Sequence, residues 1–482
     1  VPRYRSIERG NVCSDFGCKL QRESSALRSN YERGAELFRF LTDGPAVATR
    51  ATAMKKVLII AYYFPPMGGS GVQRPFQLAK YLREFGWEPV VLTQSGGAYS
   101  SYDEMMQREL ESLAIPVYRI SPTGWTPQRL SVFAGRSPQI VPQIRPGAIR
   151  SKLLSWFTRW FFIPDNKTSW ISAAVQKASE ILKEHSIDLI FATAPPFSSF
   201  LASRTISQQH HIPQVMDFRD SWVDNQYHRP ITRWHKKQIR RMEQQAVTSA
   251  SALVAINPHT AAGIRSRMPV SSSLRLEVLP NGFDPDHFGL DKFGPDDLCL
   301  DDLGPGDLGP DDLGPGDLGP DDLGPSDLDP DNFDPHHSEK NRNISAQKRW
   351  TLIHAGQLFS SSPHQRQNEI RLFLRALDRM IAQSPETASR TEMIFVGHPE
   401  PLITAWLKKQ SGMSNAINIT QIGYRPHADT LGLMREADAL LLTLSSSNEF
   451  RGVTPGKMFE YFGARKPIYA LVPRGETSRY LS

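Results

Sequence analysis

Short apolar runs alternate with amphipathic segments along the first half of the chain. The runs predict buried strands at Val57–Ala61, Pro89–Thr93, Val117–Ile120, Asp188–Ala192, Gln214–Phe218, Ala252–Ile256 and Leu276–Leu279. The segments between them predict helices at Val72–Phe85, Ser169–His185, Phe197–Gln209 and Ile231–Ser249. Strands that alternate with helices are typical of a parallel sheet with helices on both faces. We therefore expect one doubly wound, Rossmann-like α/β domain over residues 54–283.

The same pattern returns near the end of the chain. Apolar runs predict strands at Trp350–His354, Glu392–Val396, Ile417–Gln421, Ala439–Thr443 and Ile468–Val472, with a helix at Asn368–Ala382. This pattern predicts a second doubly wound domain over residues 347–482. In such sheets, ligands bind beyond the carboxyl ends of the strands.

Pentads follow one another from Asp284, most of them with the pattern Gly-Pro-x-Asp-Leu. Proline at every fifth residue is incompatible with a helix and interrupts a sheet ladder. One apolar side chain in five residues cannot offset about 1–2 kcal/mol of ordering entropy per residue. The repeat therefore predicts a disordered acidic linker over residues 284–346. Calcium binding is the weaker alternative, because the known calcium-binding repeat has nine residues and is rich in glycine.

Charge is distributed unevenly along the chain. The formal net charge is +6, but residues 284–335 contain seventeen Asp and one Lys, so the remainder is strongly basic. A basic surface favours nucleotide phosphates or an anionic membrane. The cysteines, at positions 13, 18 and 299, have no metal-ligand spacing. They are typical of a reducing, cytoplasmic setting.

The two ends carry their own expectations. Residues 1–53 are rich in Arg and Ser and lack an apolar run long enough for a signal peptide or a membrane span. We expect Met54 to be the natural start and residues 1–53 to be disordered or non-native, with a transit peptide as the weaker alternative. We also expect the second domain to be truncated, because the chain stops soon after a strand.

The stretch Arg150–Pro164 combines aromatic and basic residues and is too short to span a bilayer. Such a composition suits the interface of an anionic membrane. The alternative is a helix packed on its own domain. If the first interpretation is right, the protein is cytoplasmic and peripheral at the inner face of the membrane.

Candidate chemistry is concentrated at Gly452–Pro467. Thr454 is placed to cap a helix and Pro455 to occupy its first position, so the first-turn amides would favour an anion such as phosphate. Lys457 adds a cation in that turn. Glu460 follows on the same face and could accept hydrogen bonds from ribose hydroxyls. The alternative is an ordinary amphipathic helix with a surface Lys–Glu pair.

Three loops at strand ends in the first domain also carry unusual residues. Gly68–Gly71 is a glycine-rich turn, followed by Arg74 in the next helix, and it differs from the dinucleotide-binding fingerprint. The second loop is Ala194–Ser199. The third, Asp217–Trp222, places two carboxylates around an arginine, either as a structural ion network or as the wall of a substrate crevice.

Taken together, these phrases resemble the GT-B glycosyltransferases of the retaining family 4 type, which act on cell-surface glycans or polysaccharides. The matching phrases are AYYFPPMGGSGVQR, ATAPPFSS, DFRDSW, LPNGFDP, HAGQLF, IGYRPHADTLGLMREADALLL and PGKMFEYFGARKP. The resemblance implies two Rossmann-like domains facing a cleft. It also implies transfer of a sugar from a nucleotide-sugar to a glycan or lipid-linked acceptor, without a metal or cofactor and with no role for nucleic acid.

The resemblance also implies residue roles. It assigns donor binding to Gly68, Gly69, Arg74, Gly356, Arg366, Gly423, Tyr424, Lys457 and Glu460. We further expect catalysis by Glu449, Asp217 and Asp220, and an acceptor side that includes Arg219 and Ser198.

This chain departs from the family pattern at several positions. Gly452 stands where the family has the first of two glutamates, with Glu449 as the substitute. Gln357 replaces the usual arginine, whose charge Arg366 would supply, and Phe200 stands where some relatives have histidine.

Two other functions stay open at this point. One is a nucleotide-sugar epimerase on the same scaffold, which would need ionisable groups around the sugar. The other is a truncated, non-catalytic nucleotide-sugar-binding protein. Incubation with nucleotide-sugars separates the three, because their outcomes are transfer, epimer exchange or binding alone.

Overall fold

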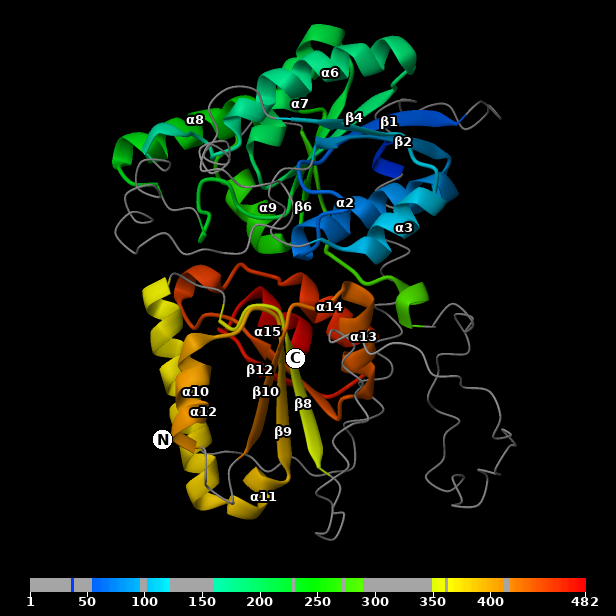
Figure 1. Cartoon of the computed structure of the whole chain (residues 1–482). Helices are drawn as coiled ribbons and strands as arrows, with labels where there is room; N and C mark the ends of the chain where they lie inside the picture. Colours follow the sequence, from blue (N-terminus) through cyan, green and yellow to red (C-terminus); the bar gives the residue numbers. More distant parts are fainter. Residues whose placement is uncertain are drawn as a thin grey trace, which may run out of the picture.

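The protein has two α/β halves, each built on one parallel sheet (Figure 1). The structure is a computed structural model. It describes residues 36–38, 54–95, 102–121, 160–227, 230–269, 274–288, 349–359, 363–410 and 417–482. The pentads after Phe288, and most of the stretch Arg150–Pro164, lie outside the described residues.

The first half contains a seven-stranded sheet in the order β3-β2-β1-β4-β5-β6-β7. Its strands are β1 Lys55–Ile60, β2 Trp87–Gln94, β3 Val117–Ile120, β4 Leu189–Ala194, β5 Gln214–Phe218, β6 Ala252–Ala255 and β7 Arg275–Val278. The order reverses between β1 and β4, which pair in parallel. The loops that follow these two strands therefore flank a crevice at the carboxyl edge of the sheet.

Helices cover both faces of this sheet. They are α2 Ser70–Tyr81, α3 Glu104–Ser112, α6 Ile171–Glu184, α7 Ser198–His210, α8 Arg233–Ser249 and α9 Pro258–Arg265, with short turns η1 Leu82–Phe85 and η2 Thr168–Trp170. In β1, Leu58 and Ile60 belong to one core, whereas Val57 and Ile59 belong to the other. This alternation is the period of two expected for a strand buried on both faces.

One segment before Met54 also belongs to this core. Leu37 and Phe38 are fully buried, and the Phe38 ring lies 5.5 Å from the rings of both Trp87 and Phe191. Leu37 and Phe38 thus pack on the first half, whereas the other residues of 1–53 lie almost entirely outside the described residues and the expectation for that segment stays a prediction. The sequence offered no signal for this contact, because two apolar residues in a polar, aperiodic segment do not define an element.

The second half contains a five-stranded sheet in the order β10-β9-β8-β11-β12. Its strands are β8 Trp350–Ala355, β9 Thr391–Val396, β10 Asn418–Gly423, β11 Ala439–Thr443 and β12 Ile468–Leu471. Its helices are α10 Pro363–Gln383, α11 Pro385–Ser389, α12 Pro401–Gln410, α13 His427–Glu436, α14 Gly456–Gly463 and α15 Glu476–Leu481, with the turn η6 Asn448–Phe450. The order reverses between β8 and β11, so this half also has a crevice at its carboxyl edge.

Residues 281–288 connect the two halves physically. They end in the turn η3 Pro285–Phe288, so the described chain continues folded past Asp284, where the sequence placed the start of the linker. Phe283 and Phe288 lie in the core of the second half. Asp284, between them, accepts hydrogen bonds from Lys80 and Tyr81 of the first half, each at 2.7 Å. This connector is thus anchored on both sides of the cleft.

The predicted fold class is confirmed: the chain has two doubly wound parallel sheets. Residues 217–218 end β5, and residues 439–443 form β11, as the apolar runs predicted. The helices α3, α9, α11, α12, α13 and α15 were not predicted. In the part of the chain that the structure describes, every helix is too short or too polar to cross a membrane.

Candidate active site

A cavity of about 420 Å³ lies between the two halves. Its volume is within the usual range for small-molecule sites, about 300–1,000 Å³. The first half contributes Gly69, Arg74 and Asp103 to its wall. The second half contributes loops and helix ends at the carboxyl edge of its sheet, including Gly356, Tyr424, Lys457 and Glu460. Six of the nine predicted donor-binding residues therefore line one cavity.

Helix α14 begins at the wall of this cavity. It starts at Gly456 with Pro455 as its N-cap, and no side chain caps it. The prediction that Thr454 is the cap is therefore wrong. The Thr454 hydroxyl instead accepts a hydrogen bond of 2.9 Å from Asn257 of the first half. The first turn of α14 still faces the cavity, because Pro455, Gly456 and Lys457 all line it.

Lys457 lies between the cavity and the end of β8. Its ammonium donates to the carbonyl oxygens of Ala355 at 3.2 Å and Gln357 at 3.4 Å, and approaches Nε2 of His354 at 3.4 Å. Burial lowers the pKa of Lys457 to about 7, although Glu460 acts in the opposite direction. Burial and the nearby Lys457 also lower the pKa of His354 to about 3, so its imidazole is neutral. Lys457 is thus a cation whose charge depends on what occupies the cavity.

Glu460 stands one turn further along α14. Its Oε1 lies 2.8 Å from Nε2 of His427, at the start of α13. Burial alone would raise the pKa of Glu460, but His427 lowers it below its usual range. Burial alone would lower the pKa of His427, but Glu460 raises it above its usual range. The two shifts agree, and they describe an ion pair on the cavity wall.

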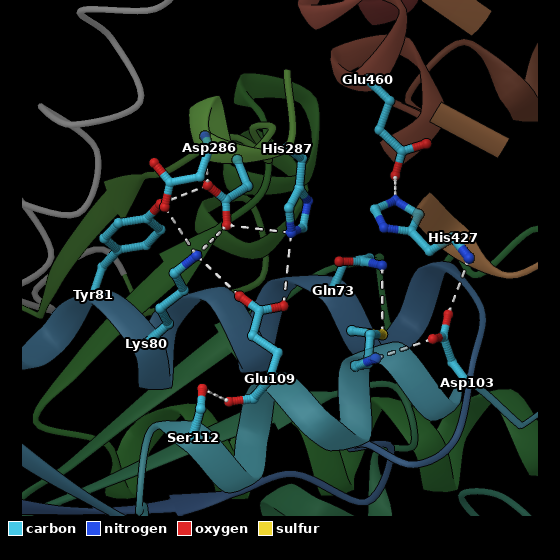
Figure 2. Close-up of polar contacts among 12 residues, drawn as sticks. Gln73, Lys80, Tyr81, Asp103, Glu109, Ser112, Asp286, His287, His427 and Glu460 are labelled. Atoms are coloured by element: carbon cyan, nitrogen blue, oxygen red, sulfur yellow. Dashed lines mark hydrogen bonds and ion pairs between the residues drawn. The ribbon is translucent and has the colours of Figure 1, made fainter. Parts of the chain in front are cut away.

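The same histidine contacts the first half. Its backbone N–H donates to Oδ2 of Asp103 at 3.1 Å, while Oδ1 of Asp103 caps α3 by accepting from Met106. Figure 2 shows Asp103, His427 and Glu460 in one chain of contacts across the cleft. The carboxylate that faces the cavity is therefore coupled to the contact between the halves.

On the first half, the glycine-rich turn and Arg74 form the opposite wall. Gly69 has φ 101° and precedes α2, a backbone conformation that only glycine adopts readily. Arg74 donates to both oxygens of Asp217, at 2.7 to 3.2 Å, and to the carbonyl of Pro280 at 3.1 Å. Asp217 is fully buried and also accepts from Thr193. Asp217 therefore reaches the cavity wall through Arg74.

A second, much smaller cavity of about 20 Å³ also lies between the halves. Arg219 and Asp220 line it from the first half and Glu449 from the second. Burial raises the pKa of Asp220 to about 6, against the opposing effects of Arg219 and Gln226. Two of the three predicted catalytic residues, Asp220 and Glu449, are thus brought together here, whereas Asp217 lies beside the larger cavity.

Gly452 lines the same small cavity, at the position where the family has a glutamate. A Cβ placed there would lie 2.1 Å from Cδ2 of His259. A larger side chain at 452 therefore requires the exposed His259 side chain to move.

The remaining predicted residues take other positions. Arg219 donates to the carbonyls of Gly71 and Pro195 and so ties the first two loops together. Ser198 is buried and bonds to Asp165 rather than facing the large cavity. Arg366 lies 3.8 Å from Glu400 and is not among the residues that line the cavity. Gly68 and Gly423 are neighbours of lining residues, and Gly423 accepts from the N–H of Gly397.

Next to the large cavity lies a charged cluster centred on Lys80 (Figure 2). Oxygens of Glu109, Asp284 and Asp286 lie 3.0, 2.7 and 3.2 Å from its ammonium. Glu109, Asp284 and His287 have the spacing of a metal-binding group. Lys80 nevertheless supplies the positive charge at this position, and it holds the connector against α2 and α3.

Sequence reasoning missed Asp103 and His427. The signal for Asp103 was present, because an N-capping aspartate precedes apolar residues Met106 and Leu110 at helical spacing. His427 lies in a phrase that was noticed, next to Tyr424, but its partner Glu460 is 33 residues away. The sequence pattern of one segment cannot show that its histidine pairs with a glutamate on another helix.

Comparisons with known proteins agree with this architecture. Residues 68–282 match the model of the Glycosyl transferase 4-like domain. The search of curated proteins finds no match.

Three solved structures are similar to the chain at low identity. HepE from Anabaena in complex with UDP-glucose is 15% identical, with a TM-score of 0.45, over 89% of this chain and 82% of that one. Sucrose-phosphate synthase from Thermosynechococcus elongatus is 13% identical, with a TM-score of 0.46, over 87% and 82%. The N-terminal domain of trehalose-6-phosphate phosphatase from Candida albicans is 10% identical, with a TM-score of 0.50, over 88% and 84%. At these identities the likeness concerns the fold alone. The chain thus has the two-domain GT-B fold, and its residues 68–282 are similar to the glycosyl transferase 4-like domain.

Proposed function

We propose that the large cavity binds a nucleotide-sugar donor and that the protein transfers the sugar to a glycan or lipid-linked acceptor. The observation that carries this proposal is the set of groups on one wall of the cavity. The start of α14, Lys457 and Glu460 lie together there, opposite the glycine-rich turn at Gly69. The glycosyl transferase 4-like domain at residues 68–282 supports the reaction class.

Each group on this wall suits one part of the donor. The first-turn amides of α14 and the Lys457 ammonium suit a diphosphate, because both favour negative charge. Glu460 suits a ribose. Its Oε1 is held by His427, and its Oε2 has no hydrogen-bond partner among the described residues, so it is available to accept from a hydroxyl. The ring of Tyr424 is 41% exposed at the same wall and offers a face for a base.

Charge stabilisation is the main chemical contribution that these residues offer. The bond to the sugar breaks as negative charge develops on the leaving diphosphate, and fixed dipoles and a cation lower that barrier. Binding of the diphosphate favours the charged form of Lys457, whose pKa is about 7 in the empty cavity. In this proposal the sugar is a hexose, it is transferred with retention, and Lys457 supplies the charge that a metal supplies in other enzymes.

The acceptor is assigned to the first half, beside the small cavity. Asp220 has a raised pKa of about 6 and can exchange a proton near neutral pH. Glu449 lines the same cavity from the second half, and in this proposal it interacts with the transferred sugar or the acceptor. A cytoplasmic site and membrane contact through Arg150–Pro164 complete the proposal, and polysaccharide synthesis is the process it fits.

The test is incubation of the full chain with a panel of nucleotide-sugars that includes UDP-glucose. The expected result is that one nucleotide raises the melting temperature and that its sugar-linked form is transferred or slowly hydrolysed. The Lys457→Ala variant should lose both effects. The Lys409→Ala variant is the matched control, because Lys409 is exposed on α12, away from the cavity.

Other outcomes of this panel would contradict the proposal. Exchange between epimers without transfer would assign the scaffold to an epimerase. Binding without turnover would make the protein a nucleotide-sugar-binding protein. The absence of any nucleotide-dependent shift would remove the donor site itself.

A further inference from the structure

Helix α8 carries a row of basic side chains on its outer face. Arg233, Lys236, Lys237, Arg240 and Arg241 are all exposed. Their spacing of i, i+3, i+4, i+7 and i+8 places them on one side of a helix. Figure 1 shows α8 at the outer edge of the upper half of the molecule.

Little in the described protein neutralises this row. Lys236 lies 3.5 Å from Asp224, which also pairs with Arg267 at 2.9 Å. Among the residues that the structure describes, the other four basic side chains of the row have no acidic partner. Four adjacent cations with the same sign repel one another, so an anionic partner would stabilise the row.

Aromatic rings stand at the start of the same helix. Trp234 is 58% exposed and Phe161 is 62% exposed, although large aromatic side chains normally bury most of their surface. Trp160 lies beside them, because its ring and that of Trp234 both contact His235, with centroids 5.1 and 5.0 Å away. Trp160 and Trp234 therefore form one group around His235, and Phe161 follows Trp160 directly in the chain.

This aromatic group is built into the fold. His235 is buried, its Nε2 contacts the carbonyl oxygen of Trp160 at 3.1 Å, and its Nδ1 contacts the Thr232 hydroxyl at 2.7 Å. Thr232 also caps α8 by accepting from the His235 N–H. The turn at residue 160 is thus fixed to the first turn of α8, which places exposed rings next to the basic row.

We propose that this basic-aromatic face, defined as Trp160, Phe161, Trp234 and the five basic residues of α8, docks on an anionic lipid bilayer. Lysine and arginine side chains are attracted to acidic headgroups, and tryptophan and phenylalanine rings insert at the boundary between headgroups and acyl chains. A bilayer satisfies both features at once, because its headgroups pair with the basic row while the rings enter the interface. A single strand of nucleic acid offers phosphates and stacking bases to the same features, and the oligonucleotide comparison below separates the two. This inference does not depend on whether the cleft transfers a sugar.

The first experiment measures sedimentation with vesicles. The wild-type chain should bind vesicles of phosphatidylcholine and phosphatidylglycerol at low salt, bind pure phosphatidylcholine weakly, and dissociate at about 0.5 M salt. Each basic residue near an acidic surface strengthens partitioning by about fivefold. Replacing Lys237, Arg240 and Arg241 by Gln should therefore weaken it by about 100-fold.

A matched variant tests whether position matters beyond charge. Arg371, Arg375 and Arg379 are exposed on α10 of the second half. Replacing these three by Gln removes the same charge and should leave vesicle binding within about twofold of wild type. Thermal unfolding must be unchanged in both triple variants, which substitute only exposed positions and are expected to fold.

A second variant separates the rings from the charges. The double variant Trp160→Ser, Trp234→Ser should still bind acidic vesicles at low salt, but it should bind less than wild type at moderate salt. Tryptophan fluorescence of the wild type should shift to the blue when vesicles are added. Wild-type protein that stays in the supernatant with acidic vesicles at low salt would overturn the proposal. So would equal losses in the α8 and α10 variants, or tighter binding to a single-stranded oligonucleotide than to vesicles.

Discussion

Nε2 of His427 lies 2.8 Å from Oε1 of Glu460, and the backbone N–H of the same histidine donates to Asp103 on the opposite half. The charge of His427 therefore affects the donor-side carboxylate and a contact between the halves at once. Glu109 and His287 also face this histidine, with the His287 ring centroid 5.6 Å away. Protonation of His427 thus changes the electrostatic interactions in both halves.

We expect this pair to stabilise the protein at mildly acidic pH. The pKa of His427 is raised in the fold, so its contribution is complete below the ordinary value of 6.5 and is lost as pH rises through the raised value. The pKa of Glu460 is lowered, so its contribution is lost as pH falls below the ordinary value of 4.5. Urea unfolding should show that His427→Gln costs about 1 kcal/mol at about pH 5.5 and much less at about pH 9.

His398→Gln is the control for this comparison. His398 is exposed and does not line the large cavity. Its substitution should change the free energy of unfolding equally at both pH values. A His427→Gln cost that is the same at both pH values would show that the ion pair does not form.

Donor binding should take up a proton at Lys457. Its pKa is about 7 in the empty cavity, and a bound diphosphate raises it, so the complex holds more protons than the free protein above pH 7. Affinity should therefore fall as pH rises. Calorimetry at about pH 8 in buffers of different ionisation enthalpy should detect this uptake, and Lys457→Met should abolish it.

Loss of either charged group should weaken the donor complex. Lys457→Ala and Glu460→Ala should each cost about 1.5–3 kcal/mol of binding free energy, because each removes a charged contact in a partly dry cleft. If both variants unfold at the same temperature as wild type and bind the nucleotide-sugar with unchanged calorimetric affinity, the donor-site assignment is wrong.

Gly463, at the end of α14, determines whether the connector can pack on the second half. A Cβ there would lie 2.6 Å from the Phe288 ring and 2.8 Å from the Phe283 ring. Gly463→Ala should therefore cost about 1–3 kcal/mol of unfolding free energy. Gly432→Ala is the matched control. A Cβ at 432 meets no atom within 4 Å on α13, and alanine should stabilise that helix by up to about 1 kcal/mol. Equal effects of the two substitutions would contradict the described packing.

The pentads should be dispensable for nucleotide binding. The residues that line the large cavity lie before position 289 or after position 349, from both halves of the chain. Deletion of Gly289–Asp334 should change nucleotide affinity by less than about twofold, with any gain in turnover. A large loss of affinity would mean that the pentads contact the donor site.

Phe38 should stabilise the first half as strongly as a residue of a regular element. Its ring is 1% exposed and contacts two aromatic rings, so Phe38→Ala should cost about 3–5 kcal/mol in urea unfolding. Leu372→Ala is the control, since Leu372 is 63% exposed on α10 and should cost little. Equal stability of the two variants would remove Phe38 from the core.

Local patterns were sufficient for the sheets. Strands such as Leu189–Ala194 and Ala439–Thr443 are mostly apolar runs in which every residue is buried, and burial on both faces of the sheet is what produces such a run. The start of α14 was placed within one residue, because Pro455 marks it. The capping partner was wrong because Thr454 bonds instead to Asn257, which is 197 residues away in the chain.

Contacts between distant segments account for the rest. Glu460 and Lys457 were selected from one helix, and they do share a cavity wall. Arg366 was chosen because it could supply the positive charge that is missing at Gln357. Its position beside Glu400 depends on how α10 packs. The sequence left Asp217 open as part of a structural ion network or of a crevice wall. In the structure Arg74, 143 residues earlier, donates hydrogen bonds to both of its carboxylate oxygens.

The burial of Phe283 and Phe288 has a consequence for how the protein can be divided. Both residues precede the pentads in the sequence, yet their side chains pack in the core of the second half. A protein cut between positions 289 and 348 should therefore yield two polypeptides that recognise each other, since the first carries two rings that only the second can bury. If separately expressed pieces recover nucleotide binding when they are mixed, the tract of repeats is a position at which the protein can be split into two associating polypeptides.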